Sequence, residues 1–189
     1  MSWRRRFGMM AAGVLLVSPG CGGKQGAPIE EAQTPVERGR YLVAIAACND
    51  CHTPMTMGPQ GPQPALARLL SGHPQELTLP PPPPLQAGSW SWVGTMTNTA
   101  FAGAWGVSFA ANLTPDEETG IGNWDEDTFI QVLRSNCHWT GDRPIMPPMP
   151  RFSYSQMTDE DLEAVFAYLK SVKPIRNQVP GYQPPATAP

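Results

Sequence analysis

Proline is the residue that most limits how this chain can fold. It makes up 23 of the 189 residues, about 12%, whereas roughly 5% is usual. Because proline lacks a backbone N–H and fixes φ, it interrupts helices and central strands. The proline content therefore argues against long helix bundles and long regular sheets. The length predicts one domain with loops and extended spacers rather than two full cores.

The charge of the chain excludes one class of function. Thirteen basic and 16 acidic residues give a net charge of −3, which argues against a strongly basic nucleic-acid binder, so no nucleic-acid partner is expected. Four cysteines and three histidines leave few candidates for metal or covalent chemistry.

The first 20 residues read as a signal peptide. Arg4, Arg5 and Arg6 form a positive start, and Phe7 to Val17 form an apolar stretch too short to span a bilayer. We therefore expect export to the periplasm. Removal of residues 1–20 takes away three arginines and no acidic residue, so the net charge changes from −3 to −6.

Cys21 is a candidate for lipidation. Ser18-Pro19-Gly20-Cys21 resembles the lipobox of bacterial lipoproteins, with serine where leucine is usual, so Cys21 would be the first mature residue and a membrane tether. The alternative is ordinary cleavage nearby without a lipid. Residues 21–33 are small and polar, and we interpret them as a tether.

A C-x-x-C-H motif, Cys48-Asn49-Asp50-Cys51-His52, predicts attachment of c-type haem. Two thiols at this spacing can each add to one haem vinyl group, and His52 can then ligate the iron from the proximal side. Three alternatives use the same cysteines. They are a thioredoxin-like redox pair, a zinc site completed by Cys137 and His138, and a structural disulfide.

Three helices are predicted from their caps. Thr34 to Glu37 form a capping box before a helix that runs to the first cysteine. Gly39 inside that helix suggests that another backbone crosses close by. Asp125 and Thr158 cap two later helices, and Leu162, Val165, Phe166 and Leu169 form one apolar face.

A second axial ligand must come from elsewhere in the chain. The candidates are Met55, Met57, Met96, Met146, Met149, Met157, His73 and His138. Most methionines fill gaps in a core, so position has to discriminate between them. Residues 141–150 form a stiff, proline-framed loop between the last two predicted helices, and this loop carries Met146 and Met149.

Three ordered segments resemble bacterial class I cytochromes c, above all the haem domains in cytochrome subunits of alcohol and gluconate-type dehydrogenases. They are RGRYLVAIAACNDCHTP, ANLTPDEETGIGNW and PPMPRFSYSQMTDEDLEAVFAYLKSV. The resemblance implies an all-α fold with three core helices around one covalently bound haem c. It assigns Cys48 and Cys51 to attachment, His52 to the proximal position and Met149 to the distal position, with Met146 as the main competitor.

The resemblance also places several groups near the haem propionates. Arg143 is the strongest of them, because a guanidinium can bind a carboxylate through two hydrogen bonds. Asn112, Trp105 and Trp124 are further candidates. Each has an ordinary alternative as loop packing or as a solvated charge.

Residues 34–175 are expected to form the monohaem domain, with a long proline-rich loop insertion at 56–100 and a proline-rich tail at 176–189. The five prolines at 80–84 favour a polyproline II spacer. The insertion would either cover a haem edge or present Trp90 and Trp92 to a partner. Alternatively, it wraps the domain and buries both tryptophans.

Together these features predict an exported electron carrier that is not itself an enzyme. His/Met ligation fills both axial sites and raises the reduction potential. The partners would be a donor dehydrogenase and a terminal acceptor, and the acidic net charge favours partners with basic patches. Two alternatives are a haem subunit that stays bound to a dehydrogenase and a haem sensor or peroxidase in which Met149 detaches.

Overall fold

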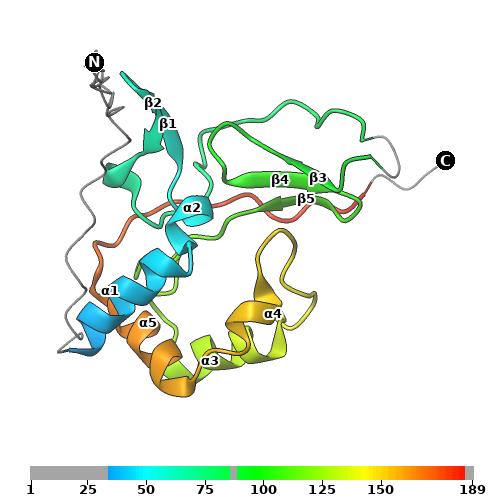
Figure 1. Ribbon diagram of the computed structural model, residues 1–189. Coiled ribbons are helices and arrows are strands. Elements are labelled where there is room, and N and C mark those ends of the chain that lie inside the picture. Colours follow the sequence, from blue (N-terminus) through cyan, green and yellow to red (C-terminus); the bar gives the residue numbers. More distant parts are fainter. Residues whose placement is uncertain (1–33, 86–88, 186–189) are drawn as a thin grey trace, which may run out of the picture. The chain divides into compact units, whose positions relative to one another are not determined.

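Helices and strands occupy separate stretches of this chain (Figure 1). The computed structural model describes residues 34–85 and 89–185. Two helices come first, α1 (Pro35–Ile45) and α2 (Cys48–His52). Strands follow as β1 (Met55–Gly58), β2 (Gly61–Pro64), β3 (Trp92–Gly94), β4 (Ala100–Gly103) and β5 (Gly106–Phe109). The chain then forms α3 (Glu126–Ser135), α4 (Arg151–Tyr154) and α5 (Asp159–Ser171).

The predicted signal peptide, the tether and the lipidation site at Cys21 lie outside the described residues. Within the described part of the chain, no helix has both the length and the apolar character needed to cross a membrane.

The first helix begins as its capping box predicts. The Thr34 side chain accepts a hydrogen bond from the Glu37 backbone, and the Glu37 carboxylate accepts one from the Thr34 backbone. Buried Gly39 then faces α5, where a Cβ atom at this position would lie 1.8 Å from the Ala164 carbonyl oxygen. Glycine is therefore required here for the two backbones to cross, as the sequence suggested.

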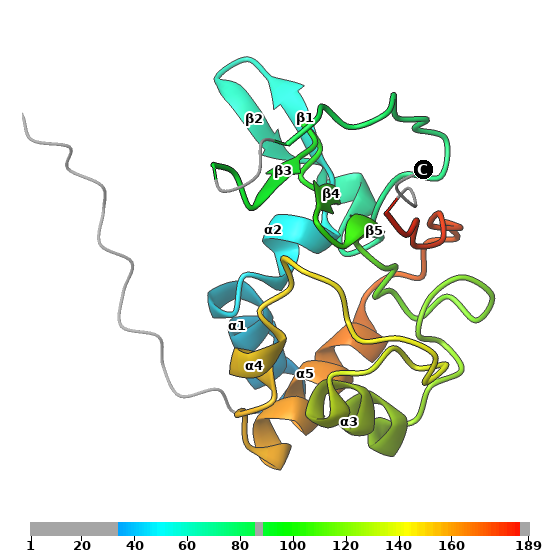
Figure 2. The ribbon, with the colours of Figure 1, turned by 90° about the vertical axis from the view of Figure 1, so that its right-hand side faces the viewer.

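The hydrophobic core lies where α1, α3 and α5 meet (Figures 1 and 2). All four residues of the predicted apolar face of α5 are buried, and Phe129 of α3 packs against Phe166 with ring centroids 5.3 Å apart. Asp125 and Thr158 accept hydrogen bonds at the starts of α3 and α5, which confirms both predicted caps. These helices form the predicted three-helix part of the fold.

The prediction of an all-α fold is wrong. β1 and β2 form an antiparallel hairpin, and β3, β4 and β5 form a second antiparallel sheet in that order. The sequence predicts a loop insertion at residues 56–100. β2 and β3 lie within this segment, β1 begins one residue before it, and β4 and β5 lie at its end and directly after it. That segment holds regular structure, although residues 79–85 within it have none.

Short hairpins explain how strands form in a proline-rich chain. Gly58 pairs with Gly61 and Gly103 with Gly106, so each hairpin closes through two residues. Gly61 and Gly106 have φ of 112° and 96°, a conformation that glycine adopts without a Cβ penalty. β2 contains Pro62 and Pro64 and pairs on one side only, with β1, so this edge strand tolerates their missing N–H groups.

The tail packs along the domain at least as far as the described residues go. Buried Asn177 donates two hydrogen bonds, to the carbonyls of Ser71 and His73. Gln183 then pairs with Val107, which covers the free edge of β5. Residues 176–185 therefore belong to the fold.

Replacement of Gly39 by alanine tests the crossing of α1 and α5. Alanine normally stabilises a helix interior by about 1 kcal/mol relative to glycine. Here we expect Gly39→Ala to lower the free energy of unfolding by about 3 kcal/mol, because the new methyl overlaps the Ala164 carbonyl. Urea denaturation followed by circular dichroism measures the change. Arg40→Ala, at the exposed neighbouring position, should change stability little, and a stabilised Gly39→Ala protein would contradict the crossing.

Candidate functional site

The proximal candidate His52 is held in one orientation. It ends α2 and is buried, with 8% of its surface exposed. Its Nδ1 atom lies 2.8 Å from the Ala111 carbonyl oxygen, so Nδ1 carries the proton and donates. Nε2 has no hydrogen-bond partner among the described residues. The second nitrogen is therefore the one available to a metal.

A short backbone ladder places the Ala111 carbonyl. The His73 N–H donates to the Ala110 carbonyl at 2.9 Å, and the Leu113 N–H donates to the Leu70 carbonyl at 2.9 Å. Between them, the Gly72 N–H donates to the His52 carbonyl at 2.8 Å. Gly72 has φ of 77°, and a Cβ atom there would lie 2.4 Å from the Ala110 carbonyl oxygen. Only glycine fits this position, which joins His52 to the segment that orients it.

Thr53 fixes the end of the motif to the same ladder. Its side chain is fully buried and its hydroxyl accepts the Leu70 N–H at 2.9 Å. The same hydroxyl donates to the Asn49 side-chain oxygen at 3.3 Å. Leu70 itself is in the left-handed region, with φ of 59°. The Thr53 hydroxyl thus accepts the buried Leu70 N–H, which lies in a turn outside the helices and strands.

The surroundings of the two motif cysteines do not favour a redox pair. Burial raises the pKa of the Cys48 thiol to about 11, and burial also raises the pKa of Cys51. Both are therefore neutral thiols at pH 7, whereas a thioredoxin-like pair needs a lowered pKa. Cys48 and Cys51 are not joined by a disulfide.

The zinc alternative is also excluded within the described residues, since no three His, Cys, Asp or Glu side chains there come close enough to hold a metal ion. Cys137 and His138 therefore do not complete a site with the motif. Cys137 is a free thiol, and His138 contacts Thr140 and Asp142 instead.

The loop with the distal candidate is anchored on both sides. The Ser108 hydroxyl of β5 donates to the Pro147 carbonyl at 2.7 Å, and the Arg151 guanidinium donates to the Ile145 carbonyl at 2.7 Å. Met149 packs against the hydrophobic core, whereas Met146 is not among the residues that pack there. Because Ser108 and Ala111 belong to one segment, that segment holds both the loop of Met149 and the imidazole of His52.

Tyr154 connects this loop to the motif. Its hydroxyl donates at 2.5 Å to the carbonyl of Ala46, which lies in the turn between α1 and α2. Burial raises the pKa of Tyr154 well above its usual range, and the nearby thiols of Cys48 and Cys51 act in the same direction. Tyr154 could not be identified from the sequence, because a single tyrosine at the end of the four-residue helix α4 has no distinctive signal.

The other side chains predicted to lie near the haem propionates make different contacts within the fold. Asn112 donates to Thr119 and to the Ile175 carbonyl and accepts two bonds from Thr114, so its amide is fully used within the fold. The indole N–H of Trp105 donates to Ser108, and Trp124 packs against the core.

Arg143 contacts the tail and its own loop. Its guanidinium carbon is 5.6 Å from the centre of the Tyr182 ring, and Nη1 donates to the Pro144 carbonyl at 3.2 Å. Its predicted role at a propionate stays a prediction.

The remaining ligand candidates occupy other positions. His73 is fully buried, with Nδ1 bonded to Thr99 and Nε2 to the Leu77 carbonyl, so both ring nitrogens are used. Met57 and Met96 are exposed, and Met157 packs against the core.

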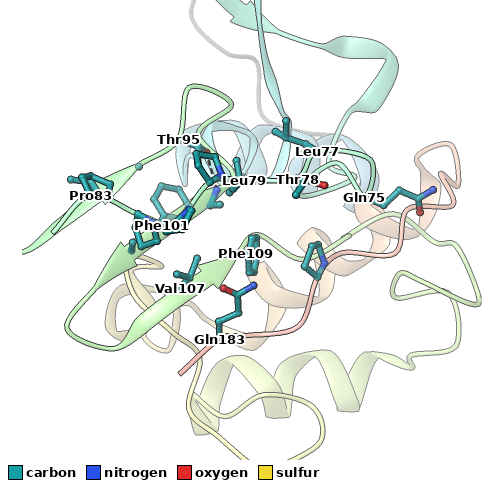
Figure 3. Close-up of a pocket in the computed structure, with 18 residues that line it drawn as sticks. Gln75, Leu77, Thr78, Leu79, Pro83, Thr95, Phe101, Val107, Phe109 and Gln183 are labelled. Carbon is teal, nitrogen blue, oxygen red and sulfur yellow. Dashed lines mark hydrogen bonds between the residues drawn. The ribbon is translucent and has the colours of Figure 1, made fainter. Parts of the chain in front are cut away.

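A cavity of about 560 Å³ lies away from this site, between the 75–83 segment and the sheet (Figure 3). Phe101, Val107 and Phe109 line it from the strands, and Leu77 and Leu79 line it from the other side. None of its lining residues comes from the C-x-x-C-H motif or from the 141–150 loop.

These residues have the chemistry that haem c needs. They supply two neutral thiols, a buried imidazole with a fixed tautomer, and a thioether on an anchored loop. The cytochrome c family model matches residues 36–173.

The chain belongs to the cytochrome c family. Covalently bound haem c is the cofactor of this family, and electron transfer rather than catalysis is its role. Three relatives carry corresponding names. The chain is 28% identical over 141 residues to the gluconate 2-dehydrogenase cytochrome c subunit of Pantoea cypripedii, covering 74% of this chain and 24% of that one. It is 27% identical over 159 residues to the fructose dehydrogenase cytochrome subunit of Gluconobacter japonicus, covering 84% and 26%.

The third relative is the cytochrome c subunit of a quinone-dependent alcohol dehydrogenase of Gluconobacter oxydans, with 27% identity over 169 residues, 89% of this chain and 27% of that one. The chain thus spans about a quarter of the length of these relatives. The likeness to cytochrome subunits of dehydrogenases that the sequence suggested is confirmed.

Two substitutions at Thr53 test the ladder behind His52. Thr53→Val keeps the shape but leaves the buried Leu70 N–H without a partner, so we expect the free energy of unfolding to fall by about 1–3 kcal/mol. Thr53→Ser keeps the hydroxyl and should lose clearly less. Urea unfolding of the haem-loaded proteins, followed by haem absorption, compares the two. Equal losses would show that the methyl group, not the hydroxyl, stabilises the site.

Proposed function

We propose that this chain is a monohaem c-type cytochrome that carries single electrons between a dehydrogenase and a further acceptor. Cys48 and Cys51 hold the haem through thioether bonds, and His52 and Met149 are its axial ligands. The described part of the chain contains one C-x-x-C-H motif, which supports a single haem.

The state of His52 is the observation that carries this proposal. The imidazole is buried and its Nδ1 donates to a backbone carbonyl, while Nε2 has no partner in the described chain. Burial also lowers the pKa of His52, so the ring is neutral at pH 7. A neutral imidazole with one nitrogen fixed by a carbonyl is the usual arrangement of a histidine that ligates a metal.

The remaining residues set the surroundings of the iron. Haem, when bound, supplies an iron that alternates between the ferric and ferrous states. Met149 offers a thioether from a loop that Ser108 and Arg151 hold in place. With both axial positions occupied, the site excludes other ligands, and the thioether raises the reduction potential relative to two nitrogen ligands.

A dehydrogenase is the proposed electron donor. The names of the relatives support it, since the gluconate, fructose and alcohol enzymes each include a cytochrome subunit similar to this chain. These names favour a haem subunit that stays bound to its dehydrogenase over a shuttle that dissociates after each transfer. Copurification of the full chain with a dehydrogenase at low concentration would distinguish the two.

We further propose that the chain works outside the cytoplasm, in the periplasm, with residues 1–20 as signal peptide and lipidated Cys21 as anchor. The arginines and apolar stretch of the first 17 residues support export. Attachment of lipid can be measured by the mass of the mature protein before and after replacement of Cys21 by serine.

The oxidised absorption spectrum tests the axial ligands. We expect the haem-loaded wild type to show the weak far-red band of an iron–sulfur bond, and Met149→Ala to lose it. Met146→Ala is the matched control, three residues away on the same loop, and should keep the band.

Two outcomes would contradict this assignment. If Met146→Ala loses the band and Met149→Ala keeps it, Met146 is the ligand. If the wild type lacks the band and its ferrous form binds carbon monoxide readily, the iron is open and a sensor or peroxidase describes the protein better.

A further inference from the structure

The charged residues of this chain are distributed very unevenly. Of its 13 basic and 16 acidic residues, the 65-residue segment 51–115 holds one of each, Arg68 and Glu76. This segment contains all five strands and the connections between them. All other charged residues lie before it or after it.

The two charges in this segment neutralise each other. Arg68 and Glu76 form an ion pair, and the Arg68 guanidinium also donates to Asn177 at 3.0 Å. The segment also contains Cys51 and His52 of the motif and one further histidine, His73, which is fully buried with both ring nitrogens hydrogen-bonded. The strand-bearing segment therefore presents no unpaired charge to solvent.

Large apolar side chains are exposed on this uncharged segment. We call Met57, Trp90, Trp92 and Met96 the neutral face, and all four are exposed. The sequence left open whether the insertion buries its tryptophans, and the structure leaves Trp90 with 71% of its surface exposed. Tryptophan and methionine are enriched at protein interfaces, and acidic residues and lysine are depleted there.

The elements of the neutral face are joined to one another. β3, which carries Trp92, leads into the turn 95–98 that carries Met96. The Met55 N–H at the start of β1 donates to the Thr97 carbonyl of that turn at 2.9 Å, and β1 carries Met57. The outer edge of β3 pairs with no strand in the described chain, whereas the tail covers the edge of β5.

The same turn contacts the helix of the C-x-x-C-H motif. Asn98, which has φ of 53°, donates from its side chain to the Asp50 carbonyl of α2 at 2.6 Å. A protein bound to the neutral face would therefore lie beside the segment that holds Cys48 and Cys51. This position suits a redox partner, since electron transfer needs a short path to the haem.

We propose that the neutral face is the docking surface for the dehydrogenase subunit that reduces this cytochrome, and that the subunit binds through an equally uncharged, apolar surface. The inference rests on the proposed function and names the contact surface of its donor. Charge matching supports this occupant, because a charged partner surface would lose hydration here without gaining an ion pair.

Two other occupants fit less well. Membrane-surface proteins combine apolar side chains with lysine and arginine that attract anionic lipids, and the neutral face has no free basic residue. The neutral face of a second copy of the chain would be an uncharged partner surface as well. A dehydrogenase subunit is the better candidate because the relatives are named as subunits of dehydrogenases.

Site-specific photo-crosslinking tests the surface. The full-length, haem-loaded protein is produced in its own host with p-benzoylphenylalanine in place of Met96, Phe152 or Val36. Met96 and Phe152 are matched in exposure, at 78% and 71%, but Phe152 lies on α4 beside the Met149 loop. Val36 at the start of α1 reports background crosslinking. Mass spectrometry identifies each product.

We expect position 96 to crosslink to a dehydrogenase subunit and positions 152 and 36 to give little of that product. Crosslinking to a second copy, to lipid only, or from position 152 alone would overturn the proposal, as would the absence of a product at position 96.

Crosslinking identifies the dehydrogenase. The rate at which this enzyme, without a crosslink, reduces the haem provides a second readout. An uncharged interface predicts that the rate changes less than about twofold between low salt and roughly 0.5 M salt. Met96→Glu should slow reduction about tenfold because it buries a charge at the contact, whereas Phe152→Glu should have little effect. A strong salt dependence with equal effects of both variants would place docking on the charged helices.

The haem spectrum separates failure of this proposal from failure of the proposed function. If the variants keep the wild-type spectrum but position 96 gives no dehydrogenase product, the docking surface is wrong and the cytochrome assignment stands. If the wild type fails to bind haem, both are wrong.

Discussion

The hydrogen bond from His52 Nδ1 to the Ala111 carbonyl is the contact on which the rest of the site depends. It fixes the tautomer of the ring, and with it the nitrogen that remains for a metal. It also joins the helical motif to the segment that follows β5. That segment in turn requires Gly72 close to Ala110, and it holds the Met149 loop through Ser108. The Ser108 hydroxyl and the Ala111 carbonyl, three residues apart, therefore position both axial candidates.

The strands are therefore part of the site, because they position the residues that hold His52 and the Met149 loop. Three helices supply the core, but no helix supplies the carbonyl that orients His52. The sheet of β3, β4 and β5 ends where Ala110 and Ala111 begin, and the Thr53 hydroxyl ties the motif to the facing segment at Leu70. The tail adds Asn177 behind the same segment. Four distant parts of the chain thus converge on one imidazole.

Local signals explain which features could be predicted from the sequence. The caps at Thr34, Asp125 and Thr158, and the close helix crossing at Gly39, follow from chemistry within a few residues, and the structure confirms them. The sheets could not be predicted because strands of three or four residues give almost no periodicity, and the high proline content obscured the hairpins that pairs of glycines close. The Ala111 carbonyl could not be found at all, because every residue has a backbone carbonyl and only the fold selects one.

The distribution of charge changes how the acidic composition should be interpreted. A net charge of −3 suggested partners with basic patches, but that inference assumes that the charge is spread over the surface. Here segment 51–115, with the turn that contacts the motif helix, has one internal ion pair and no other lysine, arginine, aspartate or glutamate. Long-range attraction depends on the whole molecule, whereas contact depends on the groups that lose their water. The uncharged strands beside the motif therefore determine what can bind closely enough to exchange an electron.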